Sequence, residues 1–154
     1  MMSLSSEVIS RLSGKTLVTA ESLTGGGIGA ELTAVPGASL VYKGGVISYV
    51  NEIKVGVLGV PQEILDQYGA VSAWTAGYMA SGVRNLMKAD IAVSVTGLAG
   101  PGGDEFGHPV GTVYIGYDSQ WESLVKEFRF HGSREDVRHQ TIEAALKLIL
   151  EQNA

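Results

Sequence analysis

The sequence predicts an α/β fold: a three-layer α/β/α sandwich around a mixed, mainly parallel sheet of five strands. Short apolar runs rich in Val, Ile and Tyr alternate with longer segments of helical periodicity. The 21 glycines cluster between these segments, as expected for tight turns. Residues 118–123 form a short connection between the last two apolar runs, which suits a hairpin better than a crossover. We therefore expect one antiparallel strand near the end of the sheet.

Apolar runs flanked by turn residues are predicted to be the buried strands, because they are short and rich in strand-forming residues. They comprise residues 16–20, 46–50, 91–95, 112–117 and 124–130. Shorter helices are expected between the early strands, at residues 24–32, 51–58 and 61–68. The last of these begins with a proline, which fits the first turn of a helix.

Two longer segments are predicted to be helices with one face in the core. Residues 72–88 begin at Ser72, which is suited to cap the helix. The final segment opens with Ser133-x-x-Asp136, a capping-box pattern, and is expected to close the domain. The residues expected to face the core from these helices are Met79, Val83, Leu86, Met87, Val137, Thr141, Ala144, Ala145 and Leu148.

The composition limits the classes of protein that the chain can represent. Its 154 residues, 45% of them hydrophobic, favour a single domain, residues 1–154. The net charge of -5 predicts no nucleic-acid or membrane partner, so any phosphate site must be local. The absence of cysteine excludes disulfides, thiolate metal sites and a cysteine nucleophile. No signal peptide is visible and no apolar stretch approaches the ~20 residues that cross a bilayer, so we expect a cytoplasmic protein.

The segment from Thr19 to Gly26 follows a predicted strand and opens a predicted helix. A hydroxyl group there, on Ser22 or Thr24, would lie beside unpaired backbone N–H groups at the positive end of a helix dipole. Such groups can hold a phosphate or stabilise an oxyanion. The alternative is that Ser22 or Thr24 only caps the helix and that the glycines allow close packing.

Two later segments also carry polar groups to the ends of predicted strands. Tyr49 ends one strand and Lys54 lies in the first turn of the next helix, so their polar tips can converge. A solvated lysine has a pKa near ~10.4, so Lys54 would need burial or a nearby cation to act as a base. Each residue alone also suits a structural role, as a surface lysine and a strand aromatic. The glycine-rich residues 94–103 form either an ordinary loop or a receptor for phosphate or carboxylate.

Six ordered motifs together resemble the C-terminal domain family of competence-damage-inducible protein CinA, which includes nicotinamide-nucleotide amidohydrolases. The resemblance covers nearly the whole chain and is more specific than any one motif. The motifs are Ala20-Glu21-Ser22-x-Thr24-Gly25-Gly26, Tyr49-x-Asn51-x-x-Lys54, Gly69-Ala70-Val71-Ser72, Gly97-x-Ala99-Gly100-Pro101, Pro109-Val110-Gly111-Thr112-Val113 and Arg138-x-Gln140.

The resemblance implies an enzyme that hydrolyses the carboxamide of nicotinamide mononucleotide to nicotinic acid mononucleotide and ammonia. Ser22 corresponds to the nucleophile and Lys54 to its base, with Tyr49 orienting the lysine or relaying the proton. No metal or organic cofactor is required, and a homodimer is expected. Backbone N–H groups of residues 24–26 would hold the oxyanion, and the loop of residues 96–102 would receive the ribose phosphate. Arg138 would neutralise the charge of the phosphate. The residues expected in these binding roles are Thr24, Gly25, Gly26, Thr96, Gly97, Gly100, Gly102 and Arg138.

The chain departs from the family pattern at Leu23, where many relatives have cysteine, but that side chain has no assigned role in the chemistry. The larger N-terminal domain of full-length CinA proteins has no counterpart here, so its activities are not expected. Two other functions remain open. One is a non-catalytic nucleotide-binding or regulatory domain of the same family, and the other is an amidase acting on a different amide.

Three further patterns are rejected. Gly14-Lys15-Thr16 is similar to the end of a P-loop, but it precedes a strand and lacks the earlier glycine. The glycines after Thr24 partly match a dinucleotide-binding fingerprint, yet the dehydrogenase pattern fails at Glu31 and the chain is too short for two nucleotide-binding halves. The three histidines show no ligand spacing, so no metal site is expected.

Overall fold

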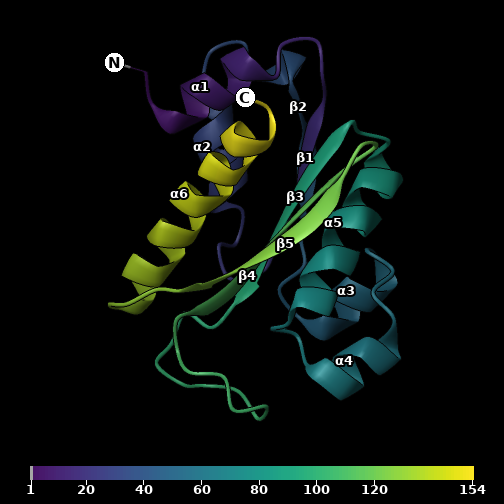
Figure 1. Ribbon diagram of the computed structural model, residues 1–154, viewed down its shortest axis with the longest axis vertical. Coiled ribbons are helices and arrows are strands. Elements are labelled where there is room, and N and C mark those ends of the chain that lie inside the picture. Colours follow the sequence, from purple (N-terminus) through teal and green to yellow (C-terminus); the bar gives the residue numbers. More distant parts are fainter. Residues whose placement is uncertain (1) are drawn as a thin grey trace.

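The computed structural model describes residues 2–154, in which the strands form a single five-stranded sheet (Figure 1). The spatial order is β2-β1-β3-β4-β5. β1 pairs in parallel with β2 and β3, whereas β4 is antiparallel to both β3 and β5. Four strands therefore share one direction and only β4 opposes them, which confirms the mixed, mainly parallel sheet. The strands are β1 (Leu17–Glu21), β2 (Tyr42–Ile47), β3 (Ile91–Gly97), β4 (Thr112–Ser119) and β5 (Ser123–Arg129).

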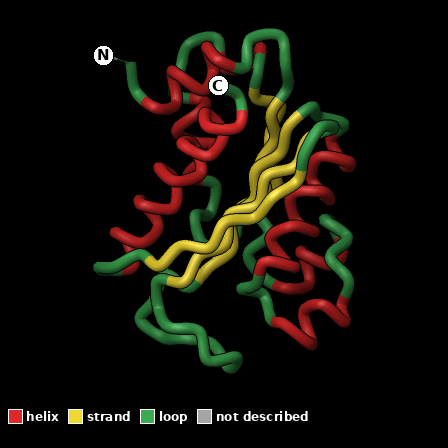
Figure 2. Tube along the Cα trace, in the orientation of Figure 1, coloured by secondary structure: helices red, strands yellow, loops and turns green. Residues whose placement is uncertain are grey.

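Helices cover both faces of the sheet, as a three-layer sandwich requires (Figures 1 and 2). α1, α2 and α6 pack together on one face, and α3, α4 and α5 lie on the other. Within residues 2–154, no helix combines the length and apolarity needed to span a membrane. The helices are α1 (Leu4–Arg11), α2 (Gly27–Thr33), the 3-10 helix η1 (Ala38–Leu40), α3 (Asn51–Gly56), α4 (Gln62–Tyr68), α5 (Ala73–Met87) and α6 (Arg134–Gln152).

The central strands are buried on both faces, because each face of the sheet meets a different helical layer. Leu17 packs into the core beneath α1, α2 and α6, whereas its neighbour Val18 joins the core beneath α5. Both side chains are fully buried. A strand with this environment needs apolar residues at consecutive positions, which explains the continuous apolar runs in the sequence.

Both predicted helix caps are confirmed. The Ser72 hydroxyl oxygen accepts a hydrogen bond from the Thr75 N–H at 3.0 Å, at the start of α5. At the start of α6, Ser133 and Asp136 form the reciprocal bonds of a capping box. Most residues expected to face the core from these helices are buried or partly buried. The expectation for Leu86 is wrong: it is 52% exposed and lines a surface groove beside Leu58 and Gly59.

Three local assignments differ from the prediction. Residues 4–11 form α1, which was not predicted. β2 begins and ends earlier than expected, because the glycine pair at residues 44–45 lies inside the strand and weakens its sequence signal. α2 begins at Gly27 and not at Thr24. Its N-cap is Gly26, whose φ of 100° is accessible to glycine but strained for other residues. Neither Ser22 nor Thr24 is therefore the helix cap.

Two glycines of α5 provide a matched test of how closely this layer is packed. A Cβ added at Gly82 would overlap the carbonyl oxygen of Leu58, whereas one at Gly77 would only touch Val125 at 3.7 Å. We expect Gly82→Ala to lower the free energy of unfolding by about 2 kcal/mol through overpacking. Gly77→Ala should raise it by about 0.5 kcal/mol through better helix propensity. Urea unfolding measures both, and equal effects of the two substitutions would contradict the packing.

Candidate active site

A cavity of about 430 Å³ lies where the carboxyl ends of β1, β2 and β3 meet. Ser22 follows β1 directly, Tyr49 and Lys54 follow β2, and a glycine-rich loop follows β3. All three segments contribute to the cavity lining. The carboxyl ends of parallel strands are the usual ligand site of an open α/β sheet, because the connecting loops diverge there.

Ser22 and Lys54 form a buried hydrogen-bonded pair in this cavity. The Ser22 N–H donates to the Val95 carbonyl oxygen at 3.1 Å, which fixes the backbone of the serine to the end of β3. Lys54 lies on α3, and its Nζ is 3.2 Å from Ser22 Oγ. The two residues are only 7% and 1% exposed. The structure therefore brings a hydroxyl and an amine, 32 positions apart in the chain, within reach of a proton transfer.

Burial makes the neutral form of the Lys54 amine easier to reach than it is for a solvated lysine. Besides Ser22 Oγ, Nζ contacts the carbonyl oxygens of Ser48 at 2.7 Å and Tyr49 at 3.2 Å. A neutral amine donates two hydrogens and accepts one, and of these three partners only the serine hydroxyl has a hydrogen to donate. Burial lowers the pKa of Lys54 from 10.5 to about 8. About a tenth of the molecules thus carry the neutral amine at pH 7.

Glu21 holds the loop that carries the serine. This buried carboxylate accepts hydrogen bonds from the Thr24 hydroxyl at 2.6 Å and from the N–H groups of Ile28 and Gly29 at 2.8 and 3.0 Å. It therefore fills the first-turn donors of α2, which would otherwise be open to an anion. The loop from Ser22 to Thr24 is fixed between the end of β1 and this carboxylate.

The expected binding residues divide into two groups. Thr96, Gly97, Gly100 and Gly102 line the cavity, as do Ser22, Tyr49 and Lys54. Thr24, Gly25, Gly26 and Arg138 are not part of the lining.

Arg138 instead holds the serine loop through main-chain contacts. Its Nε donates to the Leu23 carbonyl oxygen at 2.9 Å and its Nη2 to that of Thr24 at 3.3 Å. The Gly25 N–H is also engaged, because it donates to the Ser22 carbonyl oxygen at 3.1 Å. The structure therefore places these groups in support of the loop and not on the surface of the cavity.

Arg134 was not identified from the sequence, yet it lines the cavity. Its Nη1 donates to the Gly100 carbonyl oxygen at 2.7 Å, and its Nη2 donates to the Tyr49 hydroxyl at 3.0 Å. The Tyr49 side chain is 56% exposed and meets Arg134, while its main-chain oxygen contacts Lys54. An arginine at the start of a helix resembles a solvated residue in a sequence, so only its position beside Ser133 could have drawn attention to it.

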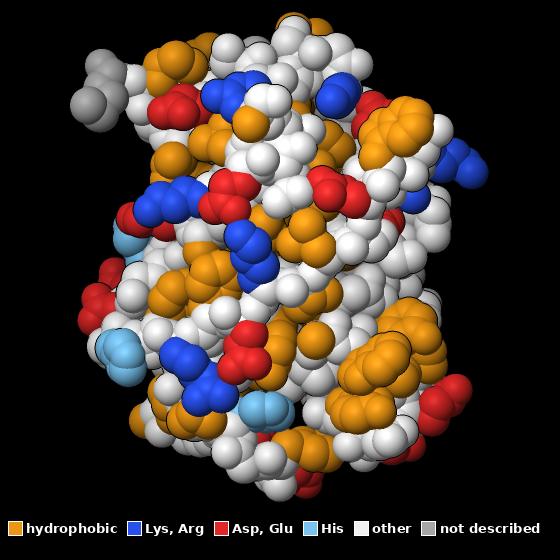
Figure 3. All heavy atoms as spheres, viewed as in Figure 1, with side chains coloured by type: hydrophobic (Ala, Val, Ile, Leu, Met, Phe, Trp, Pro, Cys, Tyr) orange, Lys and Arg blue, Asp and Glu red, His pale blue; other side chains and the backbone are white. Residues whose placement is uncertain are grey.

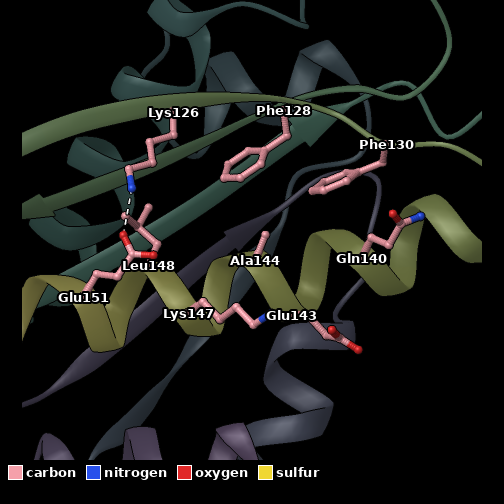
Figure 4. Close-up of a pocket in the computed structure, with 9 residues that line it drawn as sticks. All are labelled: Lys126, Phe128, Phe130, Gln140, Glu143, Ala144, Lys147, Leu148 and Glu151. Carbon is pink, nitrogen blue, oxygen red and sulfur yellow. Dashed lines mark hydrogen bonds and ion pairs between the residues drawn. The ribbon is translucent and has the colours of Figure 1, made fainter.

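A second cavity, of about 340 Å³, lies between β5 and α6 (Figure 4). Phe128 and Phe130 stack along its β5 side, and Lys126 pairs with Glu151 at 2.7 Å across it. None of its lining residues is a serine, threonine, cysteine or histidine. This cavity therefore offers no counterpart of the hydroxyl–amine pair that lies beside β1.

The described residues offer no metal centre: within residues 2–154 no group of three or more His, Cys, Asp and Glu side chains could hold an ion. Acidic and basic side chains are interspersed on the face shown in Figure 3, and hydrophobic side chains gather over α4 and α5. No extended field of one sign covers that face. The net charge of -5 gives an anionic ligand no general attraction to the protein, so local groups of the cavity must recognise it.

Comparison with known proteins assigns the family. Residues 2–153 match the model of the CinA C-terminal domain. The chain belongs to this family. It is 50% identical over 141 residues to a CinA-like protein of Thermosynechococcus vestitus, covering 90% of this chain and 34% of the relative. A putative competence-damage inducible protein of Desulforudis audaxviator is 45% identical over 136 residues, covering 88% of this chain and 33% of the relative. The chain thus spans about a third of the length of these CinA-family relatives.

Solved structures of the CinA superfamily share the fold over nearly their whole length. A superfamily protein of Klebsiella pneumoniae superposes with a TM-score of 0.95 at 36% identity, covering 97% of this chain and 95% of that one. The competence/damage inducible protein CihA of Agrobacterium tumefaciens gives a TM-score of 0.94 at 37% identity, with coverage of 98% and 94%. The sandwich described above is therefore the fold of the CinA family.

Two buried serines test the polar contacts around the site. Within residues 2–154, the Ser48 hydroxyl is the one buried side-chain oxygen or nitrogen without a hydrogen-bond partner, whereas Ser94 Oγ donates to the Ala76 carbonyl oxygen at 2.6 Å. We expect Ser48→Ala to leave the free energy of unfolding unchanged or to raise it by about 1 kcal/mol, because it removes an unsatisfied group. Ser94→Ala should lower it by about 1 kcal/mol. Thermal and urea unfolding measure both, and an equal loss would contradict the difference in bonding.

Proposed function

We propose that this chain hydrolyses the carboxamide of nicotinamide mononucleotide, giving nicotinic acid mononucleotide and ammonia. The observation that carries the proposal is the contact of 3.2 Å between Lys54 Nζ and Ser22 Oγ inside the cavity. Such a pair suits nucleophilic attack on a carbonyl carbon, because the amine can accept the hydroxyl proton. Membership of the CinA family and the resemblance of the motifs to nicotinamide-nucleotide amidohydrolases support the substrate.

In the proposed reaction, neutral Lys54 removes the proton from Ser22 as the serine oxygen bonds to the amide carbon. The tetrahedral intermediate then collapses, the C–N bond breaks, and the lysine returns the proton to the leaving nitrogen, which departs as ammonia. Water attacks the resulting ester in the second half-reaction and gives its proton to the same amine. The acid is released and Ser22 recovers its hydrogen. The scheme uses no metal or cofactor, and the family resemblance supports a homodimer. A location in the cytoplasm stays a prediction from the sequence.

The oxyanion of the intermediate needs a backbone donor close to Ser22. Leu23 lines the cavity, and its N–H group has no hydrogen-bond acceptor among the described residues. We assign the oxyanion to this group, since Thr24 lies outside the cavity lining and the Gly25 N–H is already bonded to the Ser22 carbonyl oxygen. A well-placed donor of this kind contributes roughly 3 kcal/mol to the stabilisation of the transition state. Tyr49 contributes its carbonyl oxygen, which orients the Lys54 amine.

Replacement of the nucleophile tests the reaction. Ser22→Ala should reduce ammonia release from the mononucleotide at least about a thousandfold, because no covalent intermediate can form. Ser10→Ala, at an exposed position on α1, should retain full turnover. Circular dichroism checks that both variants remain folded. Unchanged turnover in Ser22→Ala would remove the serine mechanism, and nucleotide binding by the wild type without ammonia release would favour a non-catalytic domain.

The lowered pKa of Lys54 predicts the pH dependence. Because the neutral amine is the base, kcat/KM should rise about tenfold per pH unit up to about 8, the pKa of Lys54, and then level off. The unfolded chain retains the ordinary lysine pKa of 10.5, so it binds one more proton than the folded chain between these values. The free energy of unfolding should therefore rise across this interval. If kcat/KM instead kept rising up to a pH near 10.5, Lys54 would have the pKa of a solvated lysine and the burial argument would be wrong.

A further inference from the structure

We infer that Arg134 recognises the phosphate monoester of the substrate, and that this contact selects the mononucleotide over the nucleoside that lacks the phosphate. The inference rests on the proposed function, since it assumes that a pyridine nucleotide presents its carboxamide to Ser22. Arg134 would bind the phosphate end of the substrate, while Ser22 reacts with the carboxamide end.

The charges of the cavity leave Arg134 as the partner of an anion. Within residues 2–154, the charged side chains that line the cavity are Lys54 and Arg134. The Lys54 amine is occupied by Ser22 and two carbonyl oxygens. Arg134 presents a guanidinium group, which carries a delocalised positive charge and matches the geometry of a phosphate. It is therefore the positive charge that the wall of this cavity offers to an anion.

Arg134 also keeps donors for a ligand. A guanidinium has five N–H donors, and Arg134 uses one for the Gly100 carbonyl oxygen and one for the Tyr49 hydroxyl. None of the ion pairs between described residues involves it, whereas Arg84 pairs with Asp118 and Arg129 with Glu127. Its two contacts are to neutral groups, which hold the guanidinium in place without cancelling its charge. Such an arrangement suits charge-assisted bonds to phosphate oxygens.

The surroundings of the cavity also set the direction of the substrate. A neighbouring cavity of about 370 Å³ shares Ala70, Val71 and Leu98 with it, and is bordered by Asp104 and Glu105. A phosphate placed on that side would meet two carboxylates and be repelled. With the carboxamide at Ser22, the phosphate is therefore directed toward Arg134 and the adjoining glycine-rich loop.

Arg134 and Arg138, the arginine expected to bind phosphate from the sequence, have different surroundings. Arg138 lies one helical turn further along α6, but its guanidinium is bonded to the Leu23 and Thr24 carbonyl oxygens and does not line the cavity. The recognition role that the sequence suggested for Arg138 thus passes to Arg134.

Steady-state kinetics with nicotinamide mononucleotide and nicotinamide riboside test the inference. Arg134→Ala should raise KM for the mononucleotide at least about tenfold and leave KM and kcat for the riboside within about twofold of wild type. Arg134→Lys keeps the charge but not the planar fork of donors, so its KM for the mononucleotide should lie between those of the wild type and Arg134→Ala. Arg129→Ala, which removes an exposed arginine of β5, should change neither substrate. Equal losses on both substrates would assign Arg134 to loop structure and overturn the inference.

Binding measurements separate this inference from the proposed reaction. Calorimetric titration of Ser22→Ala and of Ser22→Ala/Arg134→Ala with both compounds needs no turnover. Weaker binding of the mononucleotide alone in the double variant supports phosphate recognition, even if the wild type releases no ammonia and the proposed reaction fails. Equal affinities in the two variants, or no binding of the mononucleotide by Ser22→Ala, would overturn the role of Arg134.

Discussion

The removal of the Lys54 amine from water is the constraint on which the site depends. A lysine in solvent would hold its proton and could not serve the neighbouring hydroxyl, so the fold must bury the amine without supplying a carboxylate to keep it charged. The short helix α3 does this by placing Lys54 beneath the end of β2, against main-chain carbonyl oxygens. Burying the amine lowers the free energy of unfolding, at a position that contributes to the proposed chemistry. The two hydrophobic cores on either side of the sheet offset this loss.

The layered fold was predictable because its signals are local. Apolar runs, turn glycines and the two caps at Ser72 and Ser133 each report on a few neighbouring residues, and the short connection before β5 revealed the antiparallel strand. Boundaries were less predictable where special backbone geometry decides them. The glycine at position 26 and the Glu21 carboxylate delay the start of α2, and nothing in a window of propensities reports on a hydrogen bond from residue 28 or 29 back to residue 21.

The site was partly predictable for a similar reason. The motifs drew attention to Ser22, Lys54 and the loop after β3, which line one cavity, because the resemblance carries residue identities even where their contacts are unknown. The depth of Lys54 could not be predicted, since it depends on how α3 meets the sheet. The positions of the two arginines on α6 could not be separated either. Arg134 and Arg138 lie one helical turn apart, and one guanidinium faces the cavity while the other contacts the serine loop. The sequence does not reveal how α6 is placed against the sheet, so it could not predict which arginine faces the cavity.

The contacts of α6 with the serine loop span 115 positions of the chain, from Arg138 to Leu23. During synthesis, β1 and α3 are complete long before this last helix emerges. The loop that presents the hydroxyl therefore acquires its final restraint only when the end of the chain docks against the first half. A nascent or truncated polypeptide that stops before α6 has neither arginine. The loop that carries Ser22 thus lacks its contacts with α6 until the last helix has been made.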